Sequence, residues 1–171
     1  MFITAEELLA RYQDGERNFA GISLASRTGT PQRLADADLR GINLSGADLT
    51  GLRLEGVNLS EAILTGANFL YSVLIDVKFE GAEMHGVNLR RCQGFNVDLT
   101  GAFMRRSNWV EAKFIKPNLF YTDLEEAALI CSSLKGAINT EPFRVWGAFV
   151  WHLTLPNGSL DEGPRFVDYP D

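Results

Sequence analysis

Large apolar residues recur at every fifth position along most of this chain. Leucine stands at positions 39, 44, 49, 54 and 59, and the same series extends from residue 34 to residue 134. Of the 21 positions in this series, only Gly94 is not a large apolar residue. We call the residues of this series the centres. Their regular spacing predicts that one side chain in five is buried along residues 34–134.

The residues around each centre follow the same period. Positions two residues before a centre, from 37 to 137, are mostly small or apolar, as in Ala47, Val57 and Ala102. The position between is often Asp or Asn, and Gly often stands two residues after the centre. Gly, Asn and Asp accept the backbone angles and local hydrogen bonds of tight turns at little cost. The pattern therefore predicts a corner within every five residues.

Neither common secondary structure explains a period of five. Five residues of α-helix rotate the side chain by about 140° net, so the centres would scatter around the helix. On a flat strand, an odd spacing would place successive centres on opposite faces. A chain that turns a corner in each five residues can instead direct every centre into one interior. The sequence therefore predicts a solenoid of stacked coils.

The segments ADLRG, ADLTG, GVNLS, GANFL and GVNLR resemble the pentapeptide-repeat family, whose motif is A(D/N)LxX. The resemblance covers roughly residues 17–138 and favours cyanobacterial members. It implies an all-β solenoid, a right-handed quadrilateral parallel β-helix with four pentapeptides in each coil. Residues twenty positions apart would then stack along the rod, and the centres would make about five coils at strand spacing.

Both ends of such a rod need a cap, because an open coil presents unpaired backbone groups. At the N-terminus, Thr4 and Glu7 have the spacing of a capping box. The apolar residues that follow fall on one helix face: Leu8, Leu9 and Tyr12. We predict a helix over residues 5–14 that covers the first coil. The alternative, an amphipathic membrane anchor, is disfavoured because the segment is short and not basic.

Residues 139–171 break the period and are rich in aromatic side chains. Four of these fall within nine residues: Phe143, Trp146, Phe149 and Trp151. We interpret the region as an irregular C-terminal cap, with a ligand-binding aromatic box as the alternative. The predicted organisation is a single domain, with an N-terminal capping helix (1–16), the β-helix (17–138) and a C-terminal cap and tail (139–171).

Two irregularities interrupt the repeat. Residues 25–33 lose the motif while positions 24 and 34 stay in phase, so this segment is either a protruding loop or two degenerate repeats. Gly94 leaves one centre without a side chain. Flexible methionines at 84 and 104 and the large Trp109 can fill that space, so we predict volume compensation. A small-molecule pocket is the alternative.

The position after each centre should face solvent, and its chemistry changes along the rod. It is polar in the early coils and apolar at seven positions of the later coils. These seven residues form the candidate interaction patch: Leu70, Ile75, Phe95, Val110, Ile115, Phe120 and Ile130. With four pentapeptides in each coil, six of them would fall in two adjacent columns. Apolar patches of this extent mark binding surfaces on soluble proteins. Either the C-terminal tail folds back over the patch, or the patch contacts a partner.

Composition and charge narrow the class of protein. Of the 171 residues, 46% are hydrophobic and 22% charged, as in soluble globular proteins. The net charge of −6 argues against direct nucleic-acid binding. The N-terminal segment lacks the apolar core of a secretory signal, and no apolar run approaches the length of a membrane span. We therefore expect a cytoplasmic protein without membrane contact.

Few residues could perform catalysis. His85 and His152 belong to no metal-binding or catalytic motif, and the glycines follow the five-residue period. Cys92 falls on an inward position and Cys131 outside, about 10 Å apart along the rod, which exceeds the reach of a disulfide. We therefore predict no catalytic residues, metal, cofactor or small-molecule substrate.

These features predict a non-enzymatic scaffold for protein–protein interaction, with an unidentified protein or a second copy of the chain as partner. The family resemblance supplies one alternative function. Some pentapeptide-repeat proteins imitate duplex DNA with a strongly acidic rod and bind DNA gyrase. Here the corresponding column is interrupted: Asp38, Asn58, Lys78, Asp98 and Asn118. No continuous acidic stripe is therefore predicted.

Overall fold

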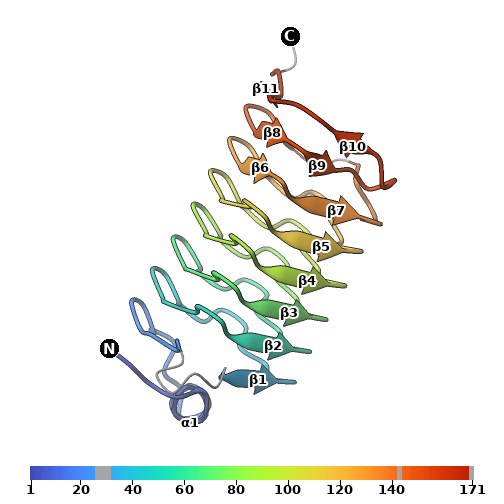
Figure 1. Cartoon of the computed structure of the whole chain (residues 1–171). Helices are drawn as coiled ribbons and strands as arrows, with labels where there is room; N and C mark the ends of the chain where they lie inside the picture. The colour runs from blue at the N-terminus through green and yellow to red at the C-terminus, as the bar shows by residue number, and fades with distance from the viewer. Residues whose placement is uncertain (26–31, 142–143, 170–171) are drawn as a thin grey trace.

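The computed structural model describes residues 1–25, 32–141 and 144–169 as a β-solenoid of about six turns. Its coils stack into a rod that runs from helix α1 (Ala5–Gln13) at one end to the C-terminal strands at the other (Figure 1). The solenoid predicted from the five-residue period is confirmed.

A three-residue strand from each regular coil builds one parallel sheet along the rod. The strands of this sheet in the regular coils are β1 (Arg33–Ala35), β2 (Arg53–Glu55), β3 (Val73–Ile75), β4 (Gln93–Phe95), β5 (Lys113–Ile115) and β7 (Ser133–Lys135). Strand β6 (Ala128–Ile130) belongs to a second sheet. Neighbours in the order β1-β2-β3-β4-β5-β7 pair with a shift of twenty positions, so Leu54 lies beside Leu74. With a period of five, this shift gives four pentapeptides in each coil.

The centres form the core of the rod. Every centre with a side chain, from Leu34 to Leu134, is no more than 3% exposed. The Asp and Asn residues before the centres form the corners: the Ser60 backbone N–H donates to Asn58 Oδ1 at 3.0 Å. Two residues after the centre the chain turns with a positive φ, which is 65° at Gly41. These turns explain why the motif favours Gly and Asp or Asn.

The missing side chain of Gly94 is replaced by an aromatic ring from the next coil. Gly94 lies beside Phe114 in the sheet, and a Cβ on Gly94 would stand 2.4 Å from Phe114 Cδ1. The Phe114 ring also packs against Trp109, with ring centroids 4.7 Å apart. Volume compensation therefore occurs at this position. The residue that fills the space directly is Phe114.

Helix α1 covers the first coil, as predicted. Thr4 Oγ1 accepts a hydrogen bond from the Glu7 backbone N–H at 3.1 Å, which caps the first turn. Leu8 is buried, and Leu9 and Tyr12 pack against the same core. Within the described ranges, no helix is long and apolar enough to cross a bilayer.

The first three residues add a contact that the sequence did not suggest. The Ser23 N–H donates to the Met1 carbonyl (2.7 Å), and the Ile3 N–H donates to the Ser23 carbonyl (3.1 Å). Gln32 ties the helix to the coil beneath it, because its Oε1 accepts from the Ala5 N–H at 2.6 Å. The N-terminal end is thus closed by a strand-like segment as well as by the helix.

The first coil is longer than those that follow. Asn18 pairs with Asn43, whereas Arg33 pairs with Arg53, so the shift is five positions greater in the first coil. The five additional residues fall between the centres at 24 and 34. The predicted loop or degenerate repeats of residues 25–33 lie mostly on residues 26–31, which are outside the described residues.

Parallel pairing continues beyond residue 138, where the repeat was expected to stop. Strand β8 (Phe149–Trp151) pairs with β6 and β9 (Leu153–Thr154) with β7, both with a shift one position longer than in the regular coils. The five-residue period resumes one residue late, at positions that pack into the core: Val145, Val150 and Leu155. With this additional coil the solenoid has about six turns, against the five predicted.

Two short antiparallel strands close the C-terminal end. Strand β10 (Leu160–Asp161) pairs with β9, and β11 (Arg165–Phe166) pairs with β8. Aromatic residues of the last coil lie outside its core. Phe149 packs against Phe166 with ring centroids 5.0 Å apart, whereas Trp151 stays 43% exposed. Phe143 is outside the described residues.

Candidate protein-interaction surface

The strands show how the repeat separates interior from exterior. In β2 to β5 the middle residue is buried and the two flanking residues are half-buried or exposed. Because neighbouring strands pair with a shift of twenty positions, outward residues separated by that shift lie side by side. Each outward position therefore belongs to a column that runs along the rod.

Three residues of the candidate patch form a continuous ladder. Ile75 lies beside Phe95, and Phe95 lies beside Ile115, at the ends of β3, β4 and β5. Phe95 and Ile115 are each 47% exposed, and Ile75 is half-buried. These side chains and Val73 help to line a shallow hollow of about 370 Å³ on the sheet.

Three further patch residues stack on the adjacent face. These residues, all half-buried, are Leu70, Val110 and Ile130. Arg90 occupies the same column between Leu70 and Val110, and its guanidinium lies 3.6 Å from Glu111. Trp151 lies beside Ile130 and continues the column. This column is more covered than the ladder of Phe95 and Ile115.

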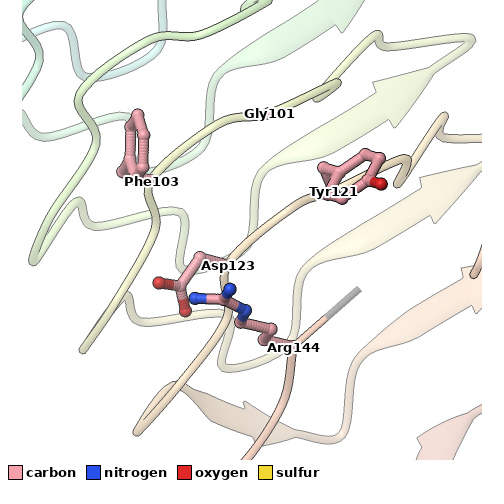
Figure 2. Close-up of a pocket in the computed structure, with 5 residues that line it drawn as sticks. All are labelled: Gly101, Phe103, Tyr121, Asp123 and Arg144. Carbon is pink, nitrogen blue, oxygen red and sulfur yellow. The ribbon is translucent and has the colours of Figure 1, made fainter. Parts of the chain in front are cut away.

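Phe120 lies on a third face, near two aromatic residues that the five-residue period did not identify as candidates, Phe103 and Tyr121. The Phe120 and Tyr121 rings meet edge to face, with centroids 4.6 Å apart. Tyr121, which is 61% exposed, lines a hollow of about 270 Å³ with Phe103, Asp123 and Arg144. Figure 2 shows Phe103 and Tyr121 on either side of Gly101, with the Asp123 and Arg144 side chains directed toward each other below them.

Phe103 could have been found from the sequence. It occupies the position before a centre, where the repeat favours Asp or Asn, and it is 48% exposed. A departure from the motif at an outward position was therefore the signal. Tyr121 stands where the chain turns a corner with φ of 54°, a position that favours Gly.

The C-terminal tail does not cover the ladder. Residues 144–169 extend the rod at its end through β8 to β11, which pair with β6, β7 and one another (Figure 1). Phe95 and Ile115 remain exposed. The described part of the tail therefore leaves the ladder open, and it lies beside the patch where Trp151 neighbours Ile130.

Arginines neutralise many carboxylates on the outside of the rod. Arg91 Nε donates to Glu111 Oε2 at 2.6 Å and Arg106 Nε to Glu126 Oε2 at 2.7 Å, and each pair joins neighbouring coils. The hydrogen bonds from these arginines lower the pKa of both glutamates. Glu55 is bound by Arg53 and Arg33, and its pKa is lowered for the same reason.

The titratable groups of catalytic interest are dispersed. Within residues 1–25, 32–141 and 144–169, no three His, Cys, Asp or Glu side chains gather in a group that could hold a metal ion. His85 packs beside Phe103, with ring centroids 6.2 Å apart. Cys92 is buried, Cys131 is exposed, and both are free thiols. Burial raises the pKa of the Cys92 thiol.

Comparisons with known proteins agree with this architecture. A family model described as pentapeptide repeats matches eight copies over residues 33–66, 53–91 and 72–108. No curated protein has a significantly similar sequence.

Several solved structures are similar to this chain. A trypsin-treated form of QnrB1, a plasmid-mediated fluoroquinolone resistance protein, is 17% identical, with 80% of this chain and 69% of that one covered and a TM-score of 0.59. Rfr23, from the cyanobacterium Cyanothece 51142, is 22% identical, with 63% and 90% covered and a TM-score of 0.49. HetL, from the cyanobacterium Nostoc sp. strain PCC 7120, is 22% identical, with 93% and 100% covered and a TM-score of 0.29. At 17% identity the likeness to QnrB1 concerns the fold alone.

Proposed function

Because the chain is a pentapeptide-repeat protein, with repeats matched over residues 33–108, we propose that it is a non-enzymatic scaffold that binds another protein. The observation that carries this proposal is the exposed apolar ladder on the sheet. Phe95 and Ile115 lie side by side, each 47% exposed. Their positions on a rigid sheet suit them to a preformed binding surface.

The filled interior supports the same proposal. The centres occupy the axis of the rod, and Phe114 fills the space at the one centre that has no side chain. The hollows that contain patch residues or their neighbours are shallow and lie on the outside. Contacts are therefore made across the outer faces, where one aromatic anchor commonly contributes most of the affinity.

Replacing Phe95 with Glu should weaken partner binding by at least about tenfold, because a charged group would replace the central apolar contact. The matched control is Thr65→Glu, at an exposed outward position two repeats out of phase with Phe95, which places it on the opposite face of the four-sided coil. Both variants should keep the circular dichroism and melting temperature of the wild type.

The measurement is a quantitative pull-down from extract of the source cells, with the wild type and both variants as bait. A protein retained by the wild type and Thr65→Glu, but depleted with Phe95→Glu, supports the proposal. If Phe95→Glu retains the same proteins in the same amounts, the ladder is not the binding surface.

The alternative of DNA mimicry and gyrase binding receives less support from the surface charge. Mimicry of duplex DNA requires rows of free carboxylates, whereas arginines bind Glu55, Glu111 and Glu126. We expect the chain to leave DNA supercoiling by purified gyrase unchanged at micromolar concentration. Inhibition of supercoiling in that assay would favour the mimic over the scaffold.

A further inference from the structure

We propose that the partner segment bound at the ladder is acidic, with carboxylates next to its apolar side chains. The inference rests on the proposed function and adds the chemistry of the partner. It depends on three lysines around Ile115, which we call the lysine cluster: Lys113, Lys116 and Lys135.

The lysine cluster encloses one end of the ladder. Lys113 precedes Ile115 by two residues in β5, and Lys116 follows it at the corner, where φ is 54°. Lys135 of β7 lies directly beside Ile115 in the sheet. All three lysines are exposed. Ile115 thus has a lysine on each of three sides.

The chain does not neutralise this cluster. Every ion pair among the described residues involves an arginine, and none of the three lysines has an ion-pair or hydrogen-bond partner for its side chain there. Glu55, the carboxylate at the opposite end of the ladder, is bound by Arg33 and Arg53. Asp76 accepts a hydrogen bond from Asn96 at 2.7 Å. A chain with net charge −6 therefore carries a local excess of positive charge beside its most exposed apolar ladder.

The spacing of the ladder suits a short peptide segment. Neighbouring strands are about 4.8 Å apart, so Ile75 and Ile115 are separated by roughly 10 Å along the rod. An extended segment of about three residues covers that distance. Its apolar side chains would lie over Ile75 and Phe95, and its carboxylates would reach the cluster beyond Ile115.

A second copy of the chain suits this surface less well than an acidic segment of another protein. In a two-fold dimer with parallel rods, the lysine cluster of one copy would face that of the other, which brings like charges together across the interface. With antiparallel rods rotated about Phe95, the register would place Lys135 opposite Glu55 and Lys116 opposite Asp76. Within the chain, however, Arg33 and Arg53 already bind Glu55, and Asn96 already donates to Asp76. An acidic segment of a different protein would bring carboxylates that have no such partners.

A random library of twelve-residue peptides displayed on phage provides the first test, with the immobilised full chain as bait. We expect the selected peptides to combine two or more Asp or Glu residues with Ile, Leu or Phe. A Lys113→Glu/Lys135→Glu bait should not enrich those sequences. Selection of neutral or basic peptides, or no enrichment, would overturn the inference.

The most enriched peptide, labelled with fluorescein, then gives affinities by anisotropy. Lys135→Glu should weaken binding about fivefold, because one attraction is lost and one repulsion is added. Lys78→Glu is the matched control: Lys78 is exposed in a different column and should change affinity less than twofold. Equal effects of the two charge reversals would contradict the inference.

Phe95→Glu separates this inference from the proposed function. If Phe95→Glu abolishes binding while Lys135→Glu does not, the scaffold proposal stands and the acidic-partner inference fails. If neither variant affects partner binding, both fail. Stronger cosedimentation of the wild type than of Lys135→Glu with vesicles containing about 30% phosphatidylserine would show that the cluster serves a membrane surface, and would also overturn the inference.

Discussion

Replacing Leu99 with Asp is expected to abolish the cooperative folding of the rod. Leu99 is a centre that is 1% exposed, in the column that includes Phe79 and Leu119. A carboxylate there would have no water and no cation within the apolar interior. Such burial costs at least several kcal/mol, which is comparable with the total stability of a typical domain.

The loss should extend beyond one coil, because coils of a solenoid are stabilised by their neighbours. The measurement is thermal unfolding by circular dichroism, with size-exclusion chromatography to detect unfolded or aggregated chain. Thr65→Asp is the control, since it introduces the same charge at an exposed outward position. If Leu99→Asp melts like Thr65→Asp, the centres do not form the core.

The regular part of the fold could be predicted because every five residues contain the same three features. These features are a buried centre, a small inward residue and a corner, and each is set by the local sequence. The centre and corner assignments are confirmed between residues 34 and 134. The family resemblance supplied what the period alone could not, namely four repeats in each coil. The pairing of Leu54 with Leu74 confirms that number.

The last coil could not be predicted because one additional residue hides its period. The pairing of Leu129 with Val150, in place of position 149, moves every later centre by one position. At the expected centre position stands Phe149, which is only half-buried, while Val150 takes the interior place. A single insertion is therefore enough to make a continuing solenoid look like an irregular cap.

The candidate surface was predictable in position but not in exposure. The period identified Phe95 and Ile115 as outward, and they are the two most exposed residues of the patch. Leu70 and Val110 are also outward, but they are half-buried, which the period alone did not indicate. The lysine cluster emerges only after the register of the sheet places Lys135 beside Ile115.

Replacing Gly94 with Leu is expected to destabilise the rod strongly, although it restores the motif at that centre. Gly94 lies in a strand, where a leucine backbone is unstrained, so the cost comes from the interior. A Cβ would stand 2.4 Å from Phe114, and the remaining side chain would need the volume that the ring occupies. Overpacking of this kind costs about 3 kcal/mol.

A second substitution should remove that penalty. Phe114→Leu alone leaves unfilled space over Gly94 and should cost about 2 kcal/mol. In the double variant, the side chain introduced by Gly94→Leu would occupy that space, so we expect a stability above that of either single variant. The control pair, Gly94→Leu with Phe79→Leu, removes a buried ring from a different column and should give roughly additive losses.

Urea unfolding of the six proteins, namely the wild type, three single variants and two pairs, measures both coupling energies. A positive coupling energy found only for positions 94 and 114 would show that these two side chains compete for the same space in the core. In the wild type, Phe114 fills that space and Gly94 leaves it free. If the losses of stability from Gly94→Leu and Phe114→Leu simply add in the double variant, the Phe114 ring does not compensate for the glycine. The core around Gly94 must then be able to relax around either residue. That outcome would also weaken the view of the sheet as rigid, because Gly94 lies in β4 directly before the outward residue Phe95.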